Sequence, residues 1–190
     1  SPSALHMAWA DWASHLAAAP GKQLELAEKA ARKTLTFQRY IAQCAASGGA
    51  AEPCIAPLPG DRRFRHEGWS KPPFNMLSQG FLLTQQWWWN ATTGLRGVTP
   101  QHQNVVNFAA RQALDMMSPA NFPMTNPEVL ARTFETGGAN LTHGARNWLE
   151  DFQRLTSRDT DYRDPDYVPG RQVAVTPGKV VLRTRLMELI

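Results

Sequence analysis

The stretch FNMLSQGFLLTQQWWWNATTG, residues 74–94, decides the fold that the sequence predicts. Each helical residue is turned by about 100° from the one before, so three consecutive tryptophans fan over about 200° and cannot all face one core. Because Phe81 and further apolar residues precede Trp87, Trp88 and Trp89, this helix is apolar nearly all round. Such a helix is either central in a helical bundle or half covered by a partner. Exposed aromatic patches mark surfaces that meet a protein or a hydrophobic polymer, so these four side chains are candidates for such a surface.

Residues 1–47 predict an amphipathic helical hairpin. Its first helix, which ends near Pro20, places Leu5, Trp9, Trp12 and Leu16 on one face. Its second helix carries an apolar stripe of Leu24, Ala27, Ala31, Leu35 and Ile41. The hairpin either docks on the rest of the domain or forms a detachable module that lies on an apolar surface or pairs with another chain. Trp9 and Trp12 are the candidate contact residues of that module.

Three further helices are expected downstream of residue 94. Thr99-Pro100 opens the first, whose apolar stripe is Val105, Phe108, Ala109 and Met116. The next starts near residue 126, either with a capping box from Thr125 to Glu128 or with Asn126 as the cap before Pro127. Gly137-Gly138 then predicts a junction between this helix and the next. The closing helix carries a regular stripe of Leu141, Ala145, Trp148, Phe152 and Leu155.

Two linkers separate these helices from the other parts of the chain. Residues 48–60 are rich in Gly and Pro, and residues 157–170 are polar and acidic. The helical domain between them therefore spans 61–156. Residues 171–190 alternate β-branched and polar side chains around a turn at 176–179, which predicts a short β-hairpin. A two-stranded hairpin is marginal alone in water, so these strands are expected to join a sheet that the helices do not supply.

Composition indicates a globular, mainly α chain. Of its 190 residues 43% are hydrophobic and only 19% charged, which argues against a disordered chain. Seven tryptophans and few charges also suggest that something covers part of the surface. No stretch reaches the roughly 20 apolar residues of a membrane span, and residues 1–16 do not have the pattern of a signal peptide. We therefore expect a soluble, unexported chain.

Catalytic and metal-binding patterns are absent from the sequence. No G-x-S-x-G turn or phosphate-binding glycine loop occurs, and the five histidines are not spaced as ligands on one helix. Cys44 and Cys54 are expected to be free thiols without the neighbours that activate a nucleophile. The net charge of +4 and one basic cluster, Arg62, Arg63 and Arg65, are too weak for a typical nucleic-acid binder. We expect no catalytic residue, metal, cofactor or nucleic-acid partner.

Four blocks of sequence, in order, resemble the N-terminal region of polyhydroxyalkanoate synthases. They are DRRFRHEGW (61–69), SPANFPMTNPEVL (118–130), ETGGANLTHGARNWLEDF (135–152) and TPGKVVLRTRLMELI (176–190). Residues 1–47 lie outside these blocks. The motif residues, interpreted as structural, are Asp61, Arg62, Arg63, Phe64, Trp69, Asn126, Pro127, Gly137 and Gly138.

The resemblance implies the N-terminal domain of a cytoplasmic, granule-associated acyltransferase. The full enzyme adds 3-hydroxyacyl units from coenzyme A thioesters to a polyester and releases CoA. Its Cys, His and Asp lie in a C-terminal α/β-hydrolase-like domain, of which residues 171–190 would be the first strands, so the chain alone is expected to be inactive. Implied partners are that domain, the polyester granule with its proteins, and a second copy of the enzyme. The alternatives are a stand-alone helical granule-binding or protein-interaction module and a basic nucleic-acid module.

Overall fold

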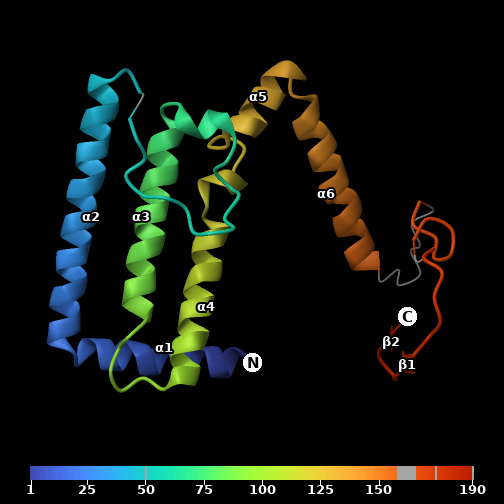
Figure 1. Ribbon diagram of the computed structural model, residues 1–190, viewed down its shortest axis with the longest axis horizontal. Helices are drawn as coiled ribbons and strands as arrows, with labels where there is room; N and C mark the ends of the chain where they lie inside the picture. Colours follow the sequence, from blue (N-terminus) through green and yellow to red (C-terminus); the bar gives the residue numbers. More distant parts are fainter. Residues whose placement is uncertain (50, 158–165, 174, 190) are drawn as a thin grey trace. The chain divides into compact units, whose positions relative to one another are not determined.

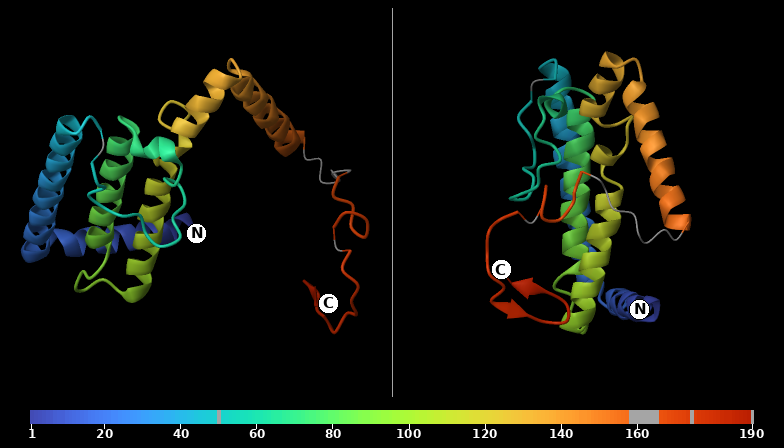
Figure 2. Two further views of the ribbon diagram at one scale, coloured as in Figure 1. Left: turned by 45° about the horizontal axis from the view of Figure 1, so that its top comes forward. Right: turned by 90° about the vertical axis from the view of Figure 1, so that its right-hand side faces the viewer.

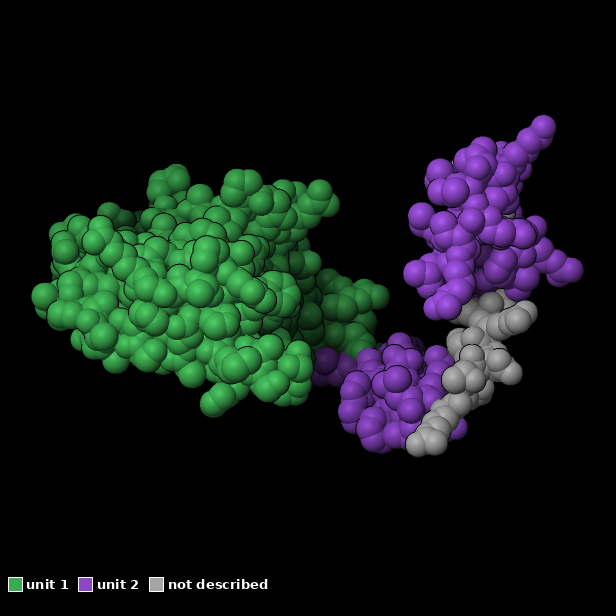
Figure 3. Space-filling model, turned by 90° about the horizontal axis from the view of Figure 1, so that it is seen from below, with its two compact units in different colours: residues 1–140 green, residues 141–190 purple. Residues whose placement is uncertain are grey.

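The computed structural model describes residues 1–49, 51–157, 166–173 and 175–189 (Figure 1). The described residues are mainly helical, with one small antiparallel pair of strands, as the sequence predicts. Their contacts divide the chain into two units, residues 1–140 and 141–190 (Figure 3). This division falls inside the range 61–156 that the sequence suggests as one domain. The two units are therefore described one at a time.

The first unit is a helical bundle built around its third helix. Its α-helices are α1 (Pro2–Ala17), α2 (Pro20–Ala46), α3 (Phe74–Thr92), α4 (Pro100–Met116) and α5 (Pro127–Glu135), with short 3-10 turns η1 (Glu67–Ser70) and η2 (Pro119–Asn121). Figure 1 and Figure 2 show α3 between α2 and α4, with α1 running across one end of these helices. The segment 74–92 thus takes the central position, but it is not apolar all round, because five of its eight buried residues are polar: Asn75, Ser78, Gln79, Gln85 and Thr92.

Local signals set the helix boundaries much as expected. The Thr99 hydroxyl accepts a hydrogen bond from the backbone N–H of His102 and caps α4. Of the two starts proposed for α5, the structure has Asn126 as the cap, since its side chain accepts from the N–H groups of Glu128 and Val129. Gly137, with φ of 58°, supplies the left-handed conformation between α5 and the next helix.

The apolar faces predicted for α2 and α4 are wrong. In α2 the stripe that includes Leu24 and Leu35 is exposed, and the buried residues are Leu26, Tyr40 and Cys44. In α4 the stripe that includes Phe108 and Met116 is exposed, and the buried residues are Val106 and Ala110. Both helices carry two apolar stripes. The small side chains of α4 let its backbone approach α3 closely, so they, and not the larger ones, lie in the core.

Polar contacts fix the other segments to α3. The Trp12 indole N–H donates to the carbonyl of Ala91 at 2.9 Å, and that of Trp87 donates to the carbonyl of Leu26 at 3.0 Å. The buried Gln79 side chain pairs with both backbone groups of Ile55, at 2.9 and 3.2 Å. Part of the segment expected to be a linker, 48–60, is thereby held against the central helix.

The second unit contains α6 (Ala139–Ser157, which starts two residues before the unit), β1 (Leu182–Arg183) and β2 (Glu188–Leu189). Every described residue of α6 from 141 onward is exposed, and so are both strands. The strands pair Leu182 with Leu189, so their turn lies at 184–187 and the turn expected at 176–179 is wrong. The Thr184 hydroxyl accepts from the N–H of Leu186 and Met187, which stabilises the later turn. Most of the expected linker 157–170 lies outside the described residues.

Candidate functional site

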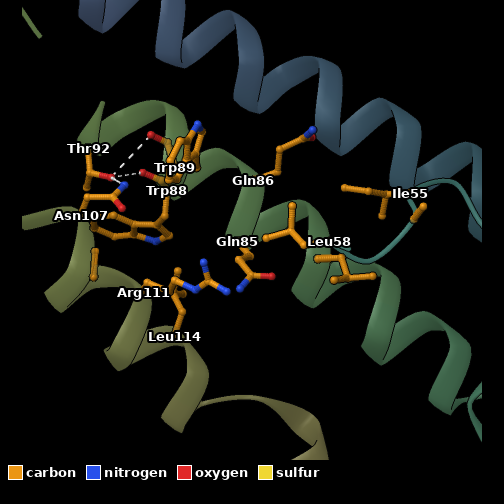
Figure 4. Close-up of a pocket in the computed structure, with 13 residues that line it drawn as sticks. Ile55, Leu58, Gln85, Gln86, Trp88, Trp89, Thr92, Asn107, Arg111 and Leu114 are labelled. Atoms are coloured by element: carbon orange, nitrogen blue, oxygen red, sulfur yellow. Dashed lines mark hydrogen bonds between the residues drawn. The ribbon is translucent and has the colours of Figure 1, made fainter. Parts of the chain in front are cut away.

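A cavity of about 430 Å³ opens between α3, α4 and the segment that holds Ile55 (Figure 4). Its walls are mostly apolar, with a few amides and one guanidinium among them. The lining residues are Ile55, Ala56, Leu58, Leu82, Gln85, Gln86, Trp88, Trp89, Thr92, Asn107, Ala110, Arg111 and Leu114. Ligand sites in proteins typically have this size and this mixture of apolar wall and few polar groups.

The three consecutive tryptophans point to different neighbours. Trp87 faces α2, where its indole N–H is bonded to Leu26, and its ring meets the Trp88 ring edge to face at 5.5 Å. Trp88 and Trp89 line the cavity, and Trp89 is 57% exposed. Of the three rings, that of Trp87 therefore lies on the side of α2, and those of Trp88 and Trp89 line the cavity.

Polar groups of the cavity are held by hydrogen bonds across α3 and α4. The Thr92 hydroxyl donates to the carbonyl of Trp88 at 2.9 Å and accepts from the Asn107 amide at 2.8 Å. Figure 4 shows this pair beside the Trp88 ring, with Gln85 and Arg111 further along the cavity. The Arg111 Nε atom lies 3.7 Å from a carboxylate oxygen of Asp115. Of these contacts, the hydrogen bond from Asn107 to Thr92 joins the two helices that form the cavity walls.

Arg63 forms an ion-pair cluster next to the cavity. Its guanidinium donates to Asp61 at 2.8 Å and to Asp115 at 2.7 Å, and it lies over the Phe81 ring at 5.1 Å. The hydrogen bonds from Arg63 hold the pKa of Asp61 below its ordinary value. The neighbouring Arg62 is exposed. The DRRF motif thus contributes one arginine that ties the 61–64 segment to α3 and α4, and one on the surface.

The motif residues Trp69 and Pro127 belong to the same structural region. Trp69 is buried against Phe64, with ring centroids 4.8 Å apart. A Cβ atom on Gly68 would lie 2.7 Å from Cβ of Pro127, so this position has room only for glycine. Motif blocks about sixty residues apart in the sequence therefore pack on each other.

Trp9 and Trp12 lie where α1 meets the bundle. Their rings are edge to face at 5.2 Å, and between them in sequence Asp11 contacts His102 of α4 at 2.6 Å. The hydrogen bond from His102, followed by the charge of His15, lowers the pKa of Asp11. Neither Trp9 nor Trp12 lines the cavity, and neither does Phe81. The structure therefore brings together only two of the six aromatic candidates, Trp88 and Trp89, at this site.

Neither cysteine has the surroundings of a nucleophile. Cys44 is buried, with the Asn75 amide nitrogen 3.5 Å from its sulfur. Burial raises the pKa of Cys54, which lowers its thiolate fraction. Burial also raises the pKa of the neighbouring Tyr40 to about 12, with a further contribution from Cys44. This cluster therefore favours neutral, structural side chains.

Among the described residues, no group of three or more His, Cys, Asp or Glu has the arrangement of a metal site. No helix in that part of the chain is both long and apolar enough to cross a membrane.

Sequence reasoning missed four polar residues of this region: Gln85, Asn107, Arg111 and Asp115. The spacing of Arg111 and Asp115, one helical turn apart, was available as a signal of an ion pair. Nothing in the sequence placed Asn107 opposite Thr92, because that contact depends on which face of α4 is buried.

Comparison with known proteins identifies the class of chain to which this bundle belongs. Residues 60–190 match the family model described as "Poly-beta-hydroxybutyrate polymerase (PhaC) N-terminus". Residues 1–22 match a second model, described as "Poly-beta-hydroxybutyrate polymerase N terminal". The chain therefore belongs to the poly-beta-hydroxybutyrate polymerase N-terminal family, as the four sequence blocks indicated. The second match adds the whole of α1 with Trp9 and Trp12, which those blocks had left out.

Individual relatives carry the same description. The chain is 40% identical over 148 residues to a poly(3-hydroxyalkanoate) polymerase of Methylorubrum extorquens, a match that covers 75% of this chain and 24% of the relative. It is 34% identical over 131 residues to the PhaC subunit of the Cupriavidus necator polymerase, covering 68% and 22%. For the PhaC subunit of Rhizobium etli, the identity is 31% over 135 residues, covering 68% and 21%.

The matches thus span less than a quarter of the length of these relatives. No solved structure matches the chain.

Proposed function

We propose that this chain is the non-catalytic N-terminal domain of a polyhydroxyalkanoate synthase. The full enzyme would transfer 3-hydroxyacyl units from CoA thioesters to a growing polyester and release CoA. The observation that carries this proposal is the family match over residues 60–190, which continues from the helical bundle into the strands.

The bundle would act by association and not by chemistry. Polyester synthesis from thioesters needs a thiolate nucleophile with a base beside it. Because Cys44 is buried in a helix and burial raises the pKa of Cys54, neither supplies that pair. The catalytic Cys, His and Asp would therefore come from the catalytic domain, and the two exposed strands at 182–189 support contact with its sheet.

The remaining roles we propose are granule association and dimer formation in the cytoplasm. Large apolar side chains stay exposed on α3, α4 and α6, among them Trp89, Phe108 and Trp148. Contiguous exposed apolar surface is typical of sites that bind a protein or a polymer. Trp89, at the rim of the cavity, is the side chain best placed to meet polyester.

Two measurements test the proposal. The chain alone should release no CoA from 3-hydroxybutyryl-CoA, and turnover above background would contradict its non-catalytic role. The purified chain should also co-sediment with poly(3-hydroxybutyrate) granules, whereas a chain that stays in the supernatant would contradict granule association.

The reading frame downstream of Ile190 separates the proposal from its alternative. A nucleophile turn with Cys in that frame supports the synthase. A stop codon would instead support a stand-alone granule-binding module.

A further inference from the structure

We propose that the cavity between α3 and α4 binds an extended segment of aliphatic polyester through the ester carbonyls of the chain. The choice of ligand rests on the proposed function, while the site itself rests on the geometry of the cavity. Its volume of about 430 Å³ admits a few hydroxyacyl units and not a folded partner.

Apolar walls suit the methyl and methylene groups of such a chain. Leu58, Leu82 and Leu114 line the cavity together with the Trp88 ring. A tryptophan offers a large rigid apolar surface and one N–H donor, a combination that fits a ligand made of alternating hydrocarbon and carbonyl groups. Figure 4 shows the Trp88 and Trp89 rings toward one end of the cavity and the aliphatic side chains of Ile55 and Leu58 toward the other.

Hydrogen-bond donors without an acceptor give the cavity a preference for a ligand that carries acceptors. Within the described residues, no acceptor is bonded to Nε1 of Trp88, to the amide nitrogen of Gln86 or to the terminal amino groups of Arg111. An aliphatic polyester has carbonyl acceptors along its length and no internal donors. A lining with spare N–H groups is therefore complementary to it, and since Gln86 and Arg111 are exposed, an ester carbonyl would replace water on these donors.

Charge balance favours a neutral ligand over an anionic one. Arg111 is the only charged residue of the lining, and it shares Asp115 with Arg63, which also pairs with Asp61. Two arginines therefore face two carboxylates, so the site carries no excess positive charge. A ligand with phosphates, such as a CoA thioester, would need more cations than this cluster provides. An ester chain needs only donors.

The test is calorimetric titration of the chain with the methyl ester of a 3-hydroxybutyrate tetramer. Trp88→Phe keeps an aromatic ring and removes the N–H, and Arg111→Met keeps the length of the side chain and removes its donors. Loss of one such hydrogen bond should weaken binding about fivefold in each variant. The matched control is Arg62→Ala, which changes an exposed arginine outside the cavity and should leave affinity unchanged.

The remaining outcomes separate this proposal from the proposed function. Equal binding of a hydrocarbon of the same length would contradict recognition through carbonyls. Tighter binding of the free acid than of the ester, lost in Arg111→Met, would overturn the neutral ligand in favour of an anionic one.

If the tetramer does not bind although the chain sediments with granules, the cavity proposal is wrong and the granule role stands. If it binds while the chain does not sediment, the cavity proposal stands and the granule role is wrong. Unchanged affinity in both folded variants would contradict the cavity as the site.

Discussion

The helices α3 and α6 are both 19 residues long and both carry aromatic side chains, yet they differ in what covers them. Eight residues of α3 are buried, and no described residue of α6 is. On α6, Arg146 and Arg154 form ion pairs with Glu150 of the same helix. The apolar stripe of α6 is exposed. This comparison shows that the presence of aromatic side chains on a helix does not by itself predict that the helix is buried.

The distribution of apolar residues around each helix explains the contrast. Apolar side chains of α3 lie on several sides of the helix, among them Leu82, Leu83 and Ala91, and α3 lies between α2 and α4 (Figure 1). A one-sided stripe such as that of Trp148 and Phe152, whose rings stack at 5.6 Å, needs only one apolar surface to lie on. We therefore expect α3 to carry the stability of the first unit and α6 to contribute little to it.

The largest expected effect comes from truncating the core side of α3. Leu82 is 3% exposed, so Leu82→Ala should lower the free energy of unfolding by about 2–5 kcal/mol. Leu155→Ala, on α6 at 82% exposed, is the matched control and should change it by less than about 0.5 kcal/mol. Urea unfolding followed by circular dichroism measures both. Similar losses in the two variants would remove the distinction between the helices.

A smaller effect is expected from the ion-pair cluster that joins residues 61–64 to α4. Arg63→Ala should cost about 2 kcal/mol because it removes the guanidinium that pairs with both Asp61 and Asp115. Arg62→Ala, its exposed neighbour, should cost less than about 0.5 kcal/mol. Urea titrations of both variants beside the wild type give the two values, and equal losses would contradict the assignment.

The cost of Arg63→Ala should also depend on pH. The pKa of Asp61 is lowered in the folded state, so its contribution is complete above its ordinary value of 3.8 and is lost as pH falls through the lower folded value. The difference between wild type and Arg63→Ala should therefore shrink below pH 3.8. Unfolding curves at pH 7 and at successively lower pH test this, and a difference that grows on acidification would exclude the ion pair as its source.

The smallest of the three effects concerns the start of α5. Asn126→Ala removes the side chain that caps the N–H groups of Glu128 and Val129, at a cost of about 1 kcal/mol. Asn126→Asp keeps the capping acceptor but loses the amide donor to the carbonyl of Ala120, so it should restore only part of that loss. If Thr125→Ala proved the more costly substitution, the capping box would be the better description of this helix start.

The sequence predicted those features that depend on local chemistry. Proline at a first helical turn and the glycine pair after α5 act within a few residues, so their outcome follows from the residues themselves. Asn126 was one of two proposed caps, and the central place of α3 was one of two proposed positions, so the structure decided between the alternatives.

Features that depend on competition between surfaces were not predictable. Both α2 and α4 have two apolar stripes, and the choice between Phe108 and Val106 for the core follows from how closely α4 approaches α3. The cavity depends on the same choice, because Asn107 and Arg111 line it only when Ala110 faces inward. The hairpin turn was misplaced because Thr184 offers two hydrogen bonds that the Pro-Gly pair at 177–178 does not match.

The central claim is that the aromatic end of α3 serves a polyester and not the core alone. Co-sedimentation of the chain with poly(3-hydroxybutyrate) granules tests it most directly, with Trp88 and Trp89 both replaced by Ala and folding verified by circular dichroism. The wild-type chain should pellet with the granules, and the folded double variant should stay mostly in the supernatant. A folded double variant that pellets as the wild type does would contradict the claim.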